Sequence, residues 1–144
     1  MSKSDMIGKL LTFIPFFFAV SAIIDYSATV WFSRTREYLV QNEFSPLLVY
    51  AVRNDLLIPY LVLTVLFYYC GSHLALKLLS QDEKLFYPAS AIIFLISLAH
   101  TFGGFSWYFK SETYSNIILA ISAIAIIMAI YLSGWSIMQK RNVS

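Results

Sequence analysis

The sequence is short of charged residues. Asp, Glu, Lys and Arg make up only 12% of its 144 residues, whereas soluble globular domains carry about 25%. A chain with so few charged side chains cannot cover its own surface with groups that water solvates well. Its mean hydropathy of +0.70 agrees with this interpretation, so we predict that its main solvent is lipid.

Cysteine and net charge are low as well. Cys70 is the only cysteine, which excludes an internal disulfide and a cysteine-rich metal site. The formal net charge of +2 is too small to indicate nucleic-acid binding, but it suits contact with anionic lipid headgroups. The composition therefore indicates a lipid bilayer as partner, and no nucleic acid.

Known catalytic patterns are absent. The sequence has no glycine-rich phosphate loop, no H-E-x-x-H or C-x-x-C pattern, and no serine in a nucleophile elbow. Its two histidines, His73 and His100, fall near opposite ends of neighbouring spans, so one haem cannot readily use both. No cofactor is indicated, and a non-catalytic role is favoured over an enzyme.

What the sequence does contain is long apolar segments. A helix needs about 20 mostly apolar residues to cross a bilayer. Four segments meet this need, at 7–32, 55–79, 86–109 and 113–138. The first contains Pro15 and Asp25 and lacks a small-residue cleavage site, so we interpret it as a retained span rather than a signal peptide.

The connections between these segments are short. Residues 33–43 form a polar stretch, which we expect to be a loop. Ser45 followed by Pro46 is a helix N-cap with proline at the first helical position, and it predicts a short interfacial helix over 45–54. Since short connections make neighbouring helices antiparallel, we predict an all-α, integral membrane protein. It is a single domain over 1–144, an up-down bundle of four transmembrane helices.

The basic residues predict how the chain lies in the membrane. One end of the bundle holds both termini and the second loop, and it has six Lys and Arg residues; the other end has four. The positive-inside rule then places both termini in the cytoplasm and the protein in the cell membrane. The six are Lys3, Lys9, Lys77, Lys84, Lys140 and Arg141, and the four are Arg34, Arg36, Arg53 and Lys110.

Small residues predict the helix contacts, because small side chains let helix backbones approach closely in lipid. We expect the following residues to face inward: Ser21, Ala22, Ala28 and Thr29 in the first span; Ser97, Thr101 and Gly104 in the third; Ser122, Ala125, Ala129, Ser133 and Ser136 in the fourth.

Two ionisable residues lie at one depth in the predicted bundle. An ionisable group inside a bilayer costs at least about 2.5–3.5 kcal/mol, so it needs an explanation. Asp25 lies in the first span and His100 in the third, which run in the same direction and carry these residues at similar distances from their ends. We predict that the two side chains pair. His73 lies at the other end of its span, and we expect it to bond to a backbone carbonyl or a serine.

The loop on the Asp25 side adds further polar residues, namely Glu43, Arg53 and Asp55. One interpretation is an ion pair of Arg53 with Asp55 or Glu43 that fixes the loop. The alternative is a divalent-metal site made by Asp25, Glu43, Asp55 and His100, since carboxylate oxygens and imidazole nitrogens are metal ligands.

Two short motifs carry a family resemblance. The first span contains D-Y-S-A-T from Asp25 to Thr29, and the loop after it contains E-F-S-P from Glu43 to Pro46. The pattern resembles a family of small, uncharacterised prokaryotic membrane proteins, marked by D-x-x-x-T in the first helix followed by E-x-N-P. The chain differs at Ser45, where that family usually has asparagine, and in its fourth span. The resemblance implies that Asp25, Thr29, Glu43 and Pro46 form one unit, and it implies no activity.

Three functions remain open at this level. The first is a non-catalytic accessory subunit or scaffold, which would assemble as a homo-oligomer or with other membrane subunits. The second is a small ion- or proton-coupled transporter that uses the Asp25–His100 pair, with Pro15 and Pro59 allowing helix breaks. The third is an intramembrane enzyme that uses the metal site described above.

Overall fold

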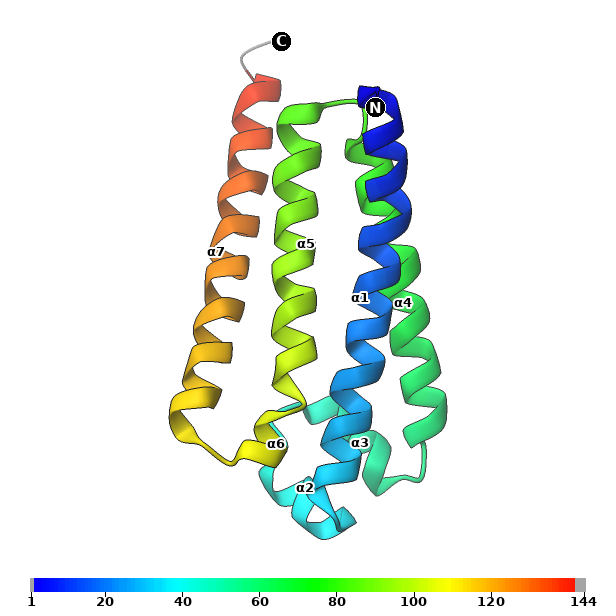
Figure 1. Cartoon of the computed structure of the whole chain (residues 1–144), viewed down its shortest axis with the longest axis vertical. Coiled ribbons are helices and arrows are strands. Elements are labelled where there is room, and N and C mark those ends of the chain that lie inside the picture. Colours follow the sequence, from blue (N-terminus) through cyan, green and yellow to red (C-terminus); the bar gives the residue numbers. More distant parts are fainter. Residues whose placement is uncertain (1, 142–144) are drawn as a thin grey trace.

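The computed structural model describes residues 2–141, and the structure within that range consists of helices and short connections, without a strand. Four helices are long, and three short helices lie at one end of the molecule (Figure 1). The long helices are α1 (Lys3–Ser33), α4 (Leu57–Leu79), α5 (Glu83–Gly103) and α7 (Glu112–Arg141). The short helices are α2 (Arg36–Asn42), α3 (Pro46–Arg53) and α6 (Ser106–Phe109).

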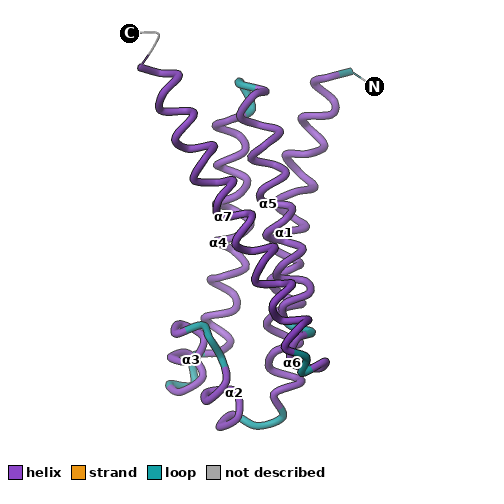
Figure 2. The backbone as a smooth tube through the Cα atoms, turned by 90° about the vertical axis from the view of Figure 1, so that its left-hand side faces the viewer, coloured by secondary structure: helices purple, strands orange, loops and turns teal. Residues whose placement is uncertain are grey.

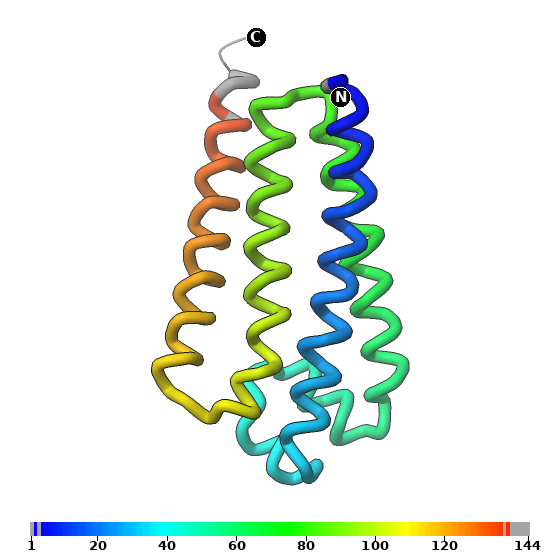
Figure 3. The backbone as a smooth tube through the Cα atoms, viewed as in Figure 1, coloured from blue at the N-terminus to red at the C-terminus, as the bar shows by residue number. Residues whose placement is uncertain are grey.

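The four long helices are each long and apolar enough to cross a membrane. They run alternately up and down, so the start of α1 and the end of α7 lie at the same end of the bundle (Figures 1 and 3). The predicted all-α membrane bundle is thereby confirmed. The bounds differ from the predicted spans by a few residues; α1, for example, begins at Lys3 because Ser2 and Asp5 form a capping box around its first turn.

The helices pack in the spatial order α4, α1, α5, α7. The backbone of α1 lies against both α4 and α5, and α7 lies against α5 and α6. Within the described residues, the α7 backbone does not closely approach that of α1 or α4. Figure 2 shows α7 and α1 spreading apart toward the end that carries the two termini. The bundle is therefore held together mainly through α1 and α5.

Two apolar clusters fill the bundle at its two ends. Near the termini, Ile14 of α1, Leu76 of α4 and Phe86 of α5 are buried together. At the opposite end, Ala22 and Tyr26 of α1 pack against residues of α2 and α3. The short helices are thus part of the packed molecule, and their docking forms the base of the region that contains the candidate site.

Most of the small residues face inward as expected. Ser21, Ala22 and Thr29 are buried in α1, and Ser97 and Ala125 are buried in α5 and α7. The expectation for Ser133 is wrong: it is exposed, and its hydroxyl donates to the Ala129 carbonyl of its own helix. A serine that satisfies its hydroxyl within its own helix can face lipid.

Residues 33–43 were expected to be a loop, but most of them form helix α2. Thr35 caps its start by accepting a hydrogen bond from the Tyr38 N–H, and Leu39 is buried against Leu48 and Val52 of α3. The expected helix at 45–54 is present as α3. Ser45 accepts from the Leu48 N–H, and Pro46 stands at the first helical position.

The prolines do not break the helices. Helix α1 continues through Pro15, and Pro59 stands in the first turn of α4, where a proline is tolerated. The interruption occurs instead in the third span, where α5 ends at Gly103 and α6 begins at Ser106. The Tyr114 hydroxyl of α7 donates to the Phe102 carbonyl at 2.9 Å, which satisfies a backbone group near this break.

Candidate functional site

A cavity of about 760 Å³ lies at the end of the bundle opposite the termini. All seven helices contribute to its lining. Its polar side includes Asp25 and Thr29 of α1, Glu43 of the α2–α3 turn and His100 of α5. Its apolar side includes Ile118, Leu119 and Ile126 of α7. The cavity therefore offers both charged and apolar surface to a ligand.

Asp25 and His100 form an ion-pair contact in the wall of this cavity. The Asp25 Oδ2 and His100 Nδ1 atoms are 2.6 Å apart, and their side chains are 19% and 23% exposed. The predicted pairing is confirmed. The imidazole ring lies beside the rings of Phe18 and Tyr68, with centroids 5.9 and 5.3 Å away. Aromatic rings on two helices therefore fix its orientation.

Two glycines allow this contact. A Cβ atom on Gly104 would lie 2.5 Å from the Asp25 carbonyl oxygen and 2.9 Å from the Ala28 Cβ. Atoms this close would overlap, so only glycine fits here without a shift of the helices. A Cβ on Gly103 would lie 3.5 Å from Asp25 Oδ1. The G-G pair is thus the point where α5 approaches the backbone of α1, one turn after His100.

Glu43 approaches the same cavity from the α2–α3 turn. Its Oε1 accepts a hydrogen bond from the Ser45 N–H at 2.9 Å, and its own N–H donates to the Leu39 carbonyl. Burial raises the pKa of the Glu43 carboxyl above its ordinary value, and the negative charge of Asp25 raises it further, although the Ser45 N–H opposes both effects. Glu43 therefore holds a proton more readily than an exposed glutamate does.

The two motif segments lie next to each other in space. Asp25, Thr29 and Glu43 all line the cavity, whereas Pro46 is exposed at the start of α3 and does not. Its place at the first turn of α3 fixes the direction in which the chain leaves the Glu43 turn.

The loop ion pair differs from the one expected. Asp55 pairs with Arg36 of α2, with 2.7 Å between Oδ1 and Nη1, rather than with Arg53. The Asp55 side chain is 83% exposed, and neither it nor Arg53 lines the cavity. Arg36 lay in the stretch interpreted as a loop, and its helix brings it to Asp55.

The metal site considered as an alternative does not form. Among residues 2–141, no three His, Cys, Asp or Glu side chains come close enough together to hold a metal ion. Asp25 and His100 are in contact and Glu43 lies on the same cavity, but Asp55 is at the surface with Arg36. The metal-dependent enzyme therefore has no support in this geometry.

The second histidine has a structural role. The Nδ1 atom of His73 lies 3.2 Å from the Leu11 carbonyl oxygen of α1, as expected for a histidine bonded to backbone.

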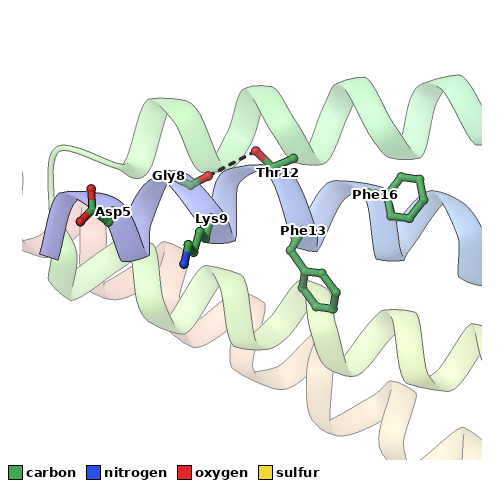
Figure 4. Close-up of a pocket in the computed structure, with 6 residues that line it drawn as sticks. All are labelled: Asp5, Gly8, Lys9, Thr12, Phe13 and Phe16. Carbon is green, nitrogen blue, oxygen red and sulfur yellow. Dashed lines mark hydrogen bonds between the residues drawn. The ribbon is translucent and has the colours of Figure 1, made fainter. Parts of the chain in front are cut away.

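A shallow hollow lies on the outer face of α1 near the termini (Figure 4). Its lining comes from α1 alone, between Asp5 and Phe16, and Thr12 donates there to the Gly8 carbonyl. One helix face does not form the walls of a binding site.

Sequence reasoning missed the aromatic part of the cavity. Tyr26, Tyr38 and Tyr68 line it together with Trp107. Counted from the same end of the bundle, Tyr68 lies 13 residues inside the predicted span 55–79, deeper than Asp25 and His100, so a count of depth along the spans does not place it in their layer.

Comparison of the chain with protein-family models, with curated proteins and with solved structures found no match in any of the three. The family resemblance of the Asp25–Thr29 and Glu43–Pro46 segments therefore stays a prediction.

Proposed function

We propose that this protein is a small proton-coupled transporter, in which the Asp25–His100 pair binds and releases protons beside a solute-binding cavity. The observation that carries the proposal is the 2.6 Å contact between these side chains in the wall of a cavity of about 760 Å³. Ionisable residues at membrane depth are rare, and they commonly mark proton relays and ion pathways.

The chemistry of the pair suits proton exchange. An imidazole and a carboxylate can each bind and release a proton. Gain or loss of one proton changes the net charge of the pair by one unit. In surroundings of low dielectric constant that change strongly affects any charged solute in the cavity. Occupancy of the cavity and protonation of the pair are therefore coupled.

The proposed orientation follows from the basic residues. The start of α1 and the end of α7 lie at the same end of the bundle (Figure 1). This end has more Lys and Arg residues than the other, which favours its placement on the cytoplasmic side. The cavity then belongs to the half of the bundle away from the cytoplasm. Because four helices make a thin wall for a pathway, we expect the transporting unit to be an oligomer.

A second candidate function is an accessory subunit of a membrane assembly. Helix α7 supports this function. Only 6% of the most apolar 18-residue stretch of α7 is buried, and large side chains such as Ile127 and Ile130 are exposed along the helix. This face is available to a second membrane protein as well as to lipid.

Proton flux in liposomes tests the transporter proposal. Vesicles loaded with a pH-sensitive dye and given a potassium diffusion potential should acidify or alkalinise faster with the wild-type protein than without protein. Asp25→Asn should reduce the flux to that of protein-free vesicles. The matched control is Asp55→Asn, which removes a carboxylate at the surface and should leave the flux intact. Equal flux in the wild type and Asp25→Asn would exclude the pair as the proton site.

A further inference from the structure

The charged groups that line the cavity favour a cation. Two carboxylates, of Asp25 and Glu43, face one permanent base, Lys110, and one titratable base, His100. When His100 is neutral, the carboxylates exceed the bases by one charge. A ligand with a single positive charge balances this excess, whereas an anion finds only Lys110, whose side chain is exposed.

The aromatic lining also suits a cation. Tyr26, Tyr38, Phe44, Tyr68 and Trp107 all line the cavity, and the faces of such rings attract positive charge. This wall already holds one cation, because the Lys110 Nζ atom lies 5.1 Å from the centre of the Tyr38 ring. Trp107 packs against Tyr38 with ring centroids 5.9 Å apart. An organic cation can use the same surface.

The remaining wall, from α7, is mainly apolar. Helix α7 contributes the apolar side chains of Ile118, Leu119 and Ile126, and the hydroxyls of Ser115 and Ser122 stand among them. The cavity is lined by both α1 and α7, although their backbones do not approach each other closely within the described residues. The cavity therefore has charged and aromatic groups on one side and mainly apolar side chains of α7 on the other, which suits a ligand that is charged and apolar at once.

We propose that the cavity binds a lipophilic organic cation, with Asp25 as its counter-ion. Its volume of about 760 Å³ lies within the roughly 300–1,000 Å³ of pockets for drug-sized ligands. The inference rests on the proposed transporter function and names its solute class: the cation replaces the proton on the Asp25–His100 pair. The titratable groups that line the cavity with Asp25 are Tyr26, Tyr38, Glu43, Tyr68, His100 and Lys110.

Binding of two probes of equal shape and opposite charge tests this inference. Tetraphenylphosphonium and tetraphenylborate are titrated into the detergent-solubilised full chain, and the fluorescence of Trp107 is followed in a Trp31→Phe, Trp135→Phe background. We expect saturable binding of the phosphonium and none of the borate. Asp25→Asn should weaken phosphonium binding by about tenfold or more, as expected when a charge contact is lost. Asp55→Asn should leave it unchanged.

A second variant and a measurement of proton release also test whether the cavity binds an organic cation. If Asp25→Asn does not purify as a folded protein, Glu43→Gln serves in its place and should also weaken phosphonium binding. A pH indicator in weak buffer should detect proton release as the phosphonium binds. Equal binding of both probes, or binding that neither carboxylate variant weakens, would overturn the inference. Asp25-dependent proton flux without phosphonium binding would support the transporter proposal and exclude an organic cation as its solute. Phosphonium binding without proton release or flux would support an organic cation as the ligand and exclude the proton-coupled transporter.

Discussion

At the scale of single residues, the ionisable and aromatic side chains of the candidate site lie together in one layer of the bundle. The Asp25 carboxylate contacts His100, Glu43 lies on the same cavity, and the rings of Phe18 and Tyr68 flank the imidazole. Each of these residues comes from a different element or turn, apart from Asp25 and Phe18, which share α1. The layer therefore exists only in the assembled bundle.

The raised pKa of Glu43 predicts a pH-dependent stability. A carboxyl whose pKa is higher in the folded protein than in the unfolded chain stabilises the fold while it is protonated. Stability therefore falls as pH rises from about 4.5, its ordinary pKa, through the raised folded pKa. Glu43→Gln removes this group and should flatten the decline that begins near pH 4.5.

Thermal unfolding in detergent, followed by circular dichroism across this pH range, measures the effect. The control is Glu37→Gln, which changes an exposed glutamate of α2 and should keep the wild-type slope. A Glu43→Gln variant that declines as steeply as the wild type would assign the pH dependence to another group.

At the scale of helices, the close approach of α5 to α1 depends on Gly104. A methyl group there would meet the Asp25 carbonyl oxygen at 2.5 Å, so Gly104→Ala must push the two helices apart. Overpacking of this kind costs about 1–3 kcal/mol, and it should also lengthen the Asp25–His100 contact.

The comparison variant is Gly134→Ala on α7, where a Cβ would meet no atom within 4 Å. Unfolding in a denaturing detergent should show a marked loss of stability for Gly104→Ala and little change for Gly134→Ala. Proton flux should fall in the first variant alone. Equal stability of the two variants would show that the helices do not meet as closely at this point.

The elements also show what the sequence can predict. The Asp25–His100 pair was predictable because helices rise by a fixed amount per residue, so position along two parallel spans gives depth. Helix α2 was not, because its seven residues are too few to be stable alone and depend on burying Leu39 against α3. The Arg36–Asp55 pair was missed for the same reason, since it forms only once α2 is helical.

At the scale of the whole molecule, α7 is the helix with the least protein around it. Its most apolar 18-residue stretch is 6% buried, compared with 28% for the corresponding stretch of α1 and 33% for that of the third span. If the protein forms an oligomer, as we propose, α7 is the helix that a second copy covers most readily. Large side chains on this surface, such as Ile127 and Ile130, are exposed in the isolated chain.

Cross-linking tests whether copies meet at α7. In a Cys70→Ser background, Ile127→Cys on the exposed face of α7 should give a dimer with a short bis-maleimide in liposomes at high lipid-to-protein ratio. Leu74→Cys, exposed on α4, is the control and should remain monomeric. Equal cross-linking at both positions would indicate random collision rather than an interface at α7.

The separation of Asp25 and His100 along the chain sets an order for biosynthesis. The two residues are 75 positions apart, and ribosomes add about 5–20 residues per second. The first span must therefore wait about 4–15 seconds, at that rate, before its partner histidine is made. During this interval the aspartate has no histidine to satisfy it, so the nascent span gains by staying near water or the insertion machinery. We expect the third span to complete this contact before the fourth span is made.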